Sequence, residues 1–98
     1  MGQVTVRLLP PLAEMAGLGA EPSGAVLTVD AKNDATVSEV LDALANKFGN
    51  KVRDAVIDSK TGSFHGYILT LVNGCVSGLN AKLKNRDDVA FAVTMGGG

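Results

Sequence analysis

The segment from Thr36 to Gly49 constrains the fold more than any other part of the sequence. Thr36 is suited to be a helix N-cap, and Glu39 three positions later completes the pattern of a capping box. Gly49 can supply the left-handed residue that ends a helix. Apolar residues recur between them at the spacing of one helical face: Val37, Val40, Leu41, Leu44 and Phe48. The sequence therefore predicts one amphipathic helix over residues 37–48.

Strand-like runs surround this helix. Residues 3–9 and 25–30 are rich in β-branched residues and predict a hairpin, with a helical turn over 12–16 between them. The apolar residues Val52, Ala55 and Val56 suggest another short helix over 52–56. The most apolar strand-length run is 67–72, which predicts a central strand. The Asn73-Gly74 pair then predicts a tight hairpin into a short strand at 75–77, and a last strand covers 89–94.

This order of elements predicts an α+β fold. Two strands, the main helix and three further strands suit a mixed sheet of four to five strands packed on one helix. Such an arrangement is the β-grasp, or ubiquitin-like, layout. We expect a single domain over residues 1–95 and a flexible glycine-rich tail over 96–98.

Composition excludes several classes of protein. Nine Lys and Arg against ten Asp and Glu give a net charge of −1, which does not favour nucleic-acid binding. The single cysteine, Cys75, excludes an intramolecular disulfide framework and a four-cysteine metal site. No apolar run reaches the ~18 residues of a membrane span, and no signal-peptide pattern is present. We therefore expect a cytoplasmic protein that binds neither membrane nor nucleic acid.

Few side chains could support catalysis by this chain alone. His65 is the only histidine and lies in a polar, glycine-flanked stretch, so an exposed loop imidazole is predicted. Cys75 is expected to pack as a small hydrophobic residue, although a Cys–His pair stays open. Glycine-rich phosphate loops of the Walker or Rossmann type are absent. We expect a protein that is not an enzyme and that holds no metal and no bound cofactor.

The tail Gly96, Gly97 and Gly98 follows directly on the last predicted strand. It has three interpretations: a frayed terminus, a linker or expression scar, or a terminal carboxylate with a function. In the third, ATP-dependent adenylation would activate the carboxylate inside another enzyme. Glycine suits such a tail because it has no Cβ to clash when the chain is threaded into an active site.

Four short sequence motifs follow one another along the chain. They are Val4–Leu9 followed by Leu12–Gly17 with an L-x-E-x-x-G pattern; Asp34–Leu44 with the helix entry; Leu71–Gly74 ending in Val-Asn-Gly; and Leu83–Phe91. In this order, and ending in Gly-Gly, they resemble the MoaD/ThiS group of β-grasp sulfur carriers. That group includes the small subunit of molybdopterin synthase, the thiamine-pathway carrier, the small archaeal modifiers and the ubiquitin-related modifier.

The resemblance implies a chemical role for the tail. An E1-like adenylating enzyme of the MoeB/ThiF type would use ATP to adenylate Gly98, and sulfur would then replace AMP to give a thiocarboxylate. Gly96 and Gly97 would thread the tail into the partner. The acceptor differs among branches: a dithiolene precursor, a thiazole precursor, a tRNA base or a cysteine-pathway intermediate. The length of the region 50–66 is closer to that of the molybdopterin carriers and the archaeal modifiers than to the shorter thiamine carriers. In the molybdopterin branch, which we favour, the partner would be the synthase large subunit.

The chain departs from the group at its end. The group commonly carries two prolines before the glycines, and this chain has none there and has a third glycine. Either the tail is one residue longer or Gly98 is trimmed, and we favour Gly98 as the acyl terminus.

Two other functions remain open: a ubiquitin-like modifier joined to lysines through the same glycine, and a non-covalent β-grasp binding module. For partner docking, apolar residues of the sheet and of the tail base are candidates, and we expect three of the first five to be core instead. These candidates are Leu8, Leu69, Leu71, Val89 and Phe91, together with Met95.

Overall fold

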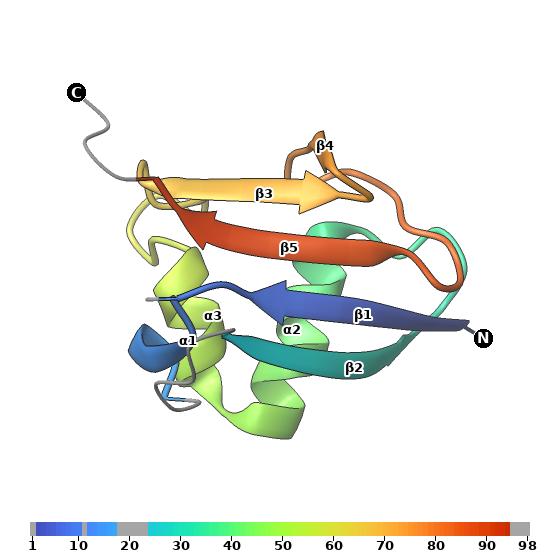
Figure 1. The fold of residues 1–98 in the computed structure, drawn as a ribbon, viewed down its shortest axis with the longest axis horizontal. Coiled ribbons are helices and arrows are strands. Elements are labelled where there is room, and N and C mark those ends of the chain that lie inside the picture. The colour runs from blue at the N-terminus through green and yellow to red at the C-terminus, as the bar shows by residue number, and fades with distance from the viewer. Residues whose placement is uncertain (1, 11, 18–23, 95–98) are drawn as a thin grey trace.

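A computed structural model describes residues 2–10, 12–17 and 24–94. Within these residues, five strands form one mixed sheet and the helices cover one of its faces (Figure 1). In chain order the elements are β1 (Gly2–Leu8), α1 (Leu12–Met15), β2 (Ala25–Ala31), α2 (Val37–Phe48), α3 (Asn50–Val56), β3 (Ile68–Val72), β4 (Cys75–Val76) and β5 (Asp88–Val93). This is the α+β, β-grasp fold that the sequence predicts.

The strand order across the sheet is β2-β1-β5-β3-β4. β1 pairs antiparallel with β2 and parallel with β5, and β3 pairs antiparallel with both β5 and β4. The prediction that residues 67–72 form the central strand is therefore wrong, because β5 takes that place. Residues 67–72 are apolar because β3 has neighbouring strands on both sides and is partly covered on both faces. Thr70 points to the helices and is buried, whereas Leu69 and Leu71 point to the opposite face and are half-buried.

The core lies between the sheet and the helices. Alternate residues of β1 and β5 point into it, as the period of two along a strand requires. The apolar face of α2 covers them, together with α1 and α3. The largest fully buried side chains are Phe91, Leu8, Leu12, Leu41, Leu44, Leu83, Val4, Val6, Val37, Val40, Val52 and Val56.

The predicted main helix is confirmed with its bounds. The Glu39 N–H donates to Thr36 Oγ1 at 3.3 Å, and the Glu39 carboxylate accepts from the Thr36 N–H at 3.2 Å, which is a complete capping box. The bond from the Thr36 backbone, with a further contribution from the Lys32 ammonium, holds the pKa of the Glu39 carboxyl below its ordinary value of 4.5. Gly49 ends the helix at a φ of 105°.

The two short helices predicted beside the main one are also present as α1 and α3. Each is placed by its buried face: Leu12 and Ala13 in α1, and Val52 and Val56 in α3. In the described residues, no helix is long and apolar enough to cross a membrane.

Candidate functional site

The point at which the tail leaves the sheet is fixed by two hydrogen bonds. The Thr94 N–H donates to the Tyr67 carbonyl at 2.7 Å, and the Thr94 hydroxyl donates to the same oxygen at 3.1 Å. The chain therefore leaves the end of β5 next to the start of β3. Met95 and Gly96–Gly98 lie outside the described residues, so the predictions made for them stay predictions.

An apolar patch lies on the sheet face opposite the helices, over β3, β4 and β5. The register sets Leu69 opposite Ala92, and Leu71 opposite Ala90 on one side and Val76 on the other. Val76 is 74% exposed, and the other four are half-buried. Apolar side chains from three adjacent strands thus form one continuous surface. We call these five residues the outer patch.

An ion pair borders the outer patch on the β1 side. Arg7 Nε donates to both carboxylate oxygens of Asp88, at 2.8 and 3.1 Å, and Arg7 is aligned with Ala90 in the parallel β1–β5 register. Both side chains are substantially exposed, so the pair contributes at most about 1 kcal/mol to folding. It gives the apolar surface a charged rim, an arrangement typical of protein interfaces.

Three of the predicted docking residues belong to the core instead. Leu8, Val89 and Phe91 are 0% exposed, because the β1–β5 register directs all three toward the helices. They cannot contact a partner in this fold, and docking roles for them are wrong. Leu69 and Leu71 do lie on the outer face, where docking remains a prediction.

Sequence reasoning missed Val76 and the two alanines of the outer patch. A signal for Val76 was present. A two-residue turn at Asn73 and Gly74 pairs residue 72 with 75 and residue 71 with 76, which places Val76 beside Leu71. Both turn residues have positive φ, 52° and 84°, as such a turn requires. Ala90 and Ala92 carried no signal, because small residues fit either face of a strand.

The two residues with reactive side chains are placed differently from the predictions. The His65 ring is half-buried, stacks on Tyr67 at 5.0 Å between centroids, and its Nε2 lies 2.9 Å from the Asp54 carbonyl, to which a protonated Nε2 would donate. Cys75 is exposed, because β4 is a two-residue strand at the sheet edge. The two residues flank opposite ends of β3, about 13 Å of strand apart, so they form no catalytic pair.

Among the described residues, no group of three or more His, Cys, Asp or Glu side chains could hold a metal ion. What the surroundings of Thr94 offer is an apolar surface and an anchored exit for the chain.

Comparison with known proteins was made by sequence and by structure. No protein-family model matches the chain, and no curated protein matches it significantly in sequence. Solved structures do match. The crystal structure of small archaeal modifier protein 1 from Haloferax volcanii is 29% identical, covers 99% of this chain and 100% of its own, and superposes with a TM-score of 0.78. The chain resembles the β-grasp sulfur carriers and ubiquitin-like modifiers.

Two further structures extend this similarity. The crystal structure of the Amycolatopsis orientalis BexX/CysO complex holds a chain that is 26% identical, with 97% of this chain and 99% of that chain covered and a TM-score of 0.65. Trypanosoma brucei Urm1 has a TM-score of 0.70 at 20% identity, with 99% and 96% covered, and shows the shared fold. The match spans nearly the whole chain, which confirms the resemblance that the motifs indicate.

Proposed function

We propose that this chain is a sulfur carrier whose Gly98 carboxylate becomes a thiocarboxylate. The observation that carries the proposal is the position of Thr94. Its two hydrogen bonds to Tyr67 hold the last described residue beside the start of β3, and the sequence continues from there into Met95 and three glycines. An anchored exit followed shortly by three glycines suits a tail that enters another protein's active site.

The chemistry takes place in the activating partner. A Gly98 carboxylate oxygen attacks the α-phosphate of ATP, and pyrophosphate leaves. A sulfur nucleophile then attacks the acyl carbon, AMP leaves, and the product carries sulfur in place of one carboxylate oxygen. This division of labour is supported by the resemblance to small carrier proteins.

The outer patch is the proposed docking surface for the partners. Leu69, Leu71 and Val76 would supply the apolar centre, and the Arg7–Asp88 pair would lie at its rim. We propose an E1-like adenylating enzyme of the MoeB/ThiF type as the first partner. We propose the large subunit of molybdopterin synthase as the second partner, the enzyme in which the sulfur acceptor is bound. The BexX/CysO complex supports the general idea that a chain of this kind binds a protein partner.

A second function is favoured by the similarity to small archaeal modifier protein 1. Attack on the same adenylated or thioester-linked glycine by a lysine amine would give an isopeptide bond instead of a thiocarboxylate. Both functions use Gly98, so the tail alone does not separate them.

Intact-mass measurement of the protein purified from its native host separates the candidate functions. A gain equal to the exchange of one oxygen for sulfur supports the carrier. Glycine remnants on lysines of other proteins support the modifier. The absence of both products would favour the binding module.

Deletion of Gly97 and Gly98 tests the role of the tail directly. The variant should keep its circular dichroism spectrum and lose ATP–pyrophosphate exchange with the cognate activating enzyme. Normal exchange by this variant would refute both covalent functions.

A further inference from the structure

His65 connects the helix α3 to the place where the tail leaves the sheet. It lies between α3 and β3, two positions before Tyr67, whose carbonyl accepts both hydrogen bonds from Thr94. Figure 1 shows the chain passing from the end of α3 to the start of β3, next to the end of β5. The position of the tail exit therefore depends on how this connection is held.

The C-terminal end of α3 has carbonyl groups that the helix itself cannot satisfy. The Asp58 N–H, which would bond to Asp54 if the helix continued, donates to the Ser63 carbonyl at 2.8 Å instead. His65 supplies donors to this end of the helix. Its N–H donates to the Val56 carbonyl at 3.0 Å, and a protonated Nε2 donates to the Asp54 carbonyl, 2.9 Å away.

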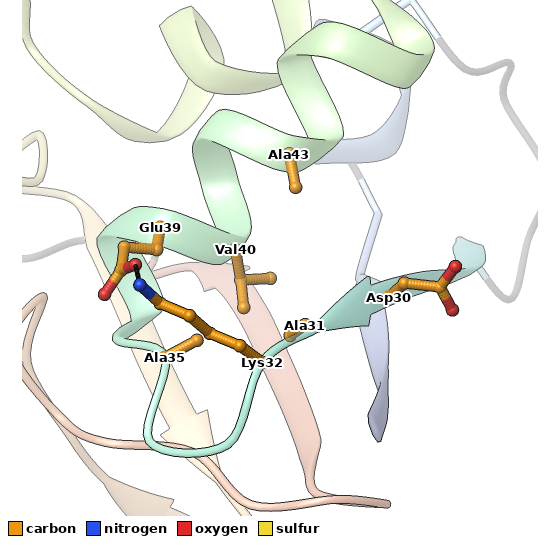
Figure 2. Close-up of a pocket in the computed structure, with 7 residues that line it drawn as sticks. All are labelled: Asp30, Ala31, Lys32, Ala35, Glu39, Val40 and Ala43. Atoms are coloured by element: carbon orange, nitrogen blue, oxygen red, sulfur yellow. Dashed lines mark ion pairs between the residues drawn. The ribbon is translucent and has the colours of Figure 1, made fainter. Parts of the chain in front are cut away.

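The residue that caps α3 is distant from it in sequence. At the start of α2 the cap is local, since Glu39 bonds to Thr36 three positions earlier and pairs with Lys32 at 3.5 Å (Figure 2). His65, in contrast, follows the last residue of α3 by nine positions. Its two bonds therefore hold the far end of the 57–65 loop against the helix, in addition to capping the helix.

The His65 ring also stacks on the side chain of Tyr67. The two rings are nearly parallel, with an interplanar angle of 7° and 5.0 Å between their centroids, and such contacts stabilise beyond the burial of area. The bond from Nε2 to α3 fixes the plane of the imidazole in this stack. The His65 carbonyl accepts from the Ile68 N–H at 3.0 Å, which closes a turn around Tyr67. Side chain and backbone of Tyr67 are thus both held relative to α3.

The tail beyond this anchor is short. Gly98 is four residues beyond Thr94, and four residues span at most about 14 Å when fully extended. A tail of this length has little reach with which to compensate for a displaced exit. The position of Thr94 therefore affects how readily the Gly98 carboxylate reaches a fixed active site.

We propose that His65 is a positioning residue for the tail. It holds Tyr67 against the end of α3, and Tyr67 holds Thr94, so that the tail leaves the sheet in one direction. The stacked ring is the contact that acts on Tyr67, and the bond to α3 orients that ring. This inference rests on the proposed function, because it concerns the approach of Gly98 to the activating enzyme. His65 itself takes no part in the chemistry.

Hydrogen exchange in the isotopically labelled full chain, followed by NMR, tests the link without any partner. In His65→Ala, the Thr94 amide should exchange about tenfold faster than in the natural protein, because Tyr67 loses its support. The amides of Asn73 and Asp88 are the internal reference. Each is hydrogen-bonded to the other residue at the opposite end of β5, and their exchange should not change.

Two further variants separate the ring from its hydrogen bond. His65→Phe keeps a ring that can stack on Tyr67, so it should retain most of the protection of the Thr94 amide. His65→Gln keeps a donor for α3 and loses the stacked ring, so it should release Thr94 as His65→Ala does. The glutamine variant also decides the question if the alanine variant does not fold.

ATP–pyrophosphate exchange with the cognate activating enzyme gives the second measurement. The outer patch is unchanged in His65→Ala, so KM for the chain should stay the same. The kcat should fall about fivefold, because fewer docked molecules present the tail correctly, and His65→Phe should recover most of it. Phe48→Ala is the matched control: it removes a 38% exposed ring at the end of α2 and should change neither value.

Two results would overturn the inference. The Thr94 amide could keep its natural exchange rate in folded His65→Ala and His65→Gln, which would show that the ring does not hold the exit. Alternatively, Thr94 could be released while kcat stays unchanged, which would show that the exit need not be held. A natural protein without any ATP–pyrophosphate exchange would instead refute the proposed function, and the amide measurement would still decide whether His65 holds Thr94.

Discussion

The side chain of Asn73 joins two turns that are distant in sequence by bonding to the backbone of Asp88. Asn73 Oδ1 accepts from the Asp88 N–H at 3.0 Å, and the Asp88 carbonyl accepts from the Asn73 N–H at 2.7 Å. Asn73 Nδ2 also donates to the Asp87 carboxylate at 3.0 Å. The Val-Asn-Gly motif is thus explained by structure: it holds the β3–β4 hairpin, and with it Val76 of the outer patch, against the start of β5.

Replacement of Asn73 should show the strength of this connection. Asn73→Ala removes both side-chain bonds and leaves a residue with a Cβ at a φ of 52°, so we expect a loss of about 1–3 kcal/mol in unfolding free energy. Asn73→Gly loses the same bonds without the backbone strain and should cost less. Urea unfolding measures both. Equal stability of Asn73→Ala and the natural protein would show that the bonds contribute nothing.

Arg86 is a site where glycine should stabilise the protein. Its φ is 71°, in the left-handed region that costs a residue with a Cβ about 1–2 kcal/mol. After the extra unfolded-state entropy of glycine, Arg86→Gly should gain about 0.5–1 kcal/mol. Arg86→Ala keeps the Cβ and serves as the control, with no gain expected in thermal unfolding.

Thr70 carries a buried hydroxyl that lacks a hydrogen-bond partner within the described residues. The residue is 2% exposed and lies opposite Phe91 on the core face of β3. Thr70→Val replaces that hydroxyl by a methyl group of similar shape and should raise stability by about 1 kcal/mol. Thr70→Ser keeps the hydroxyl and loses a methyl group, so it should lower stability. A destabilised valine variant in chemical denaturation would indicate a partner for the hydroxyl.

The capping box should make stability depend on pH at the acidic end. Because the pKa of Glu39 is lowered in the folded state, chiefly by the Thr36 N–H, its ionised form stabilises folding above pH 4.5. That contribution is lost as pH falls through the lowered value. Glu39→Gln can still cap the helix but cannot ionise, so the two proteins should differ at pH 7 and converge in strong acid. Parallel thermal unfolding curves across pH would contradict this.

Two exposed valines on the same sheet face allow a matched test of the outer patch. Val76 belongs to the patch and is 74% exposed, whereas Val26 lies on β2 and is 58% exposed. Val76→Asp should weaken association with the activating enzyme about tenfold, and Val26→Asp should leave it unchanged. Both variants should fold normally. Surface-binding measurements with the purified partner check this, and equal effects of the two variants would remove the patch as the docking surface.

The helices and strands could be predicted from local sequence signals. The main helix was predictable because its capping box and its apolar spacing are properties of neighbouring residues, and the Asn73-Gly74 hairpin because a two-residue turn fixes its own register. The same local signals sufficed for α1 and α3. The fold class followed from the order of these elements.

Which strand residues are core and which lie on the outer face of the sheet depends on how the strands pair. Leu8, Val89 and Phe91 are core, and Leu69 and Leu71 are on the outer face, although all five are apolar residues in strands. The parallel pairing of β1 with β5, whose residues are about 80 positions apart, sets this difference. Local sequence contains no record of such a pairing, because it arises when the helices bury one face of the completed sheet and leave the other open.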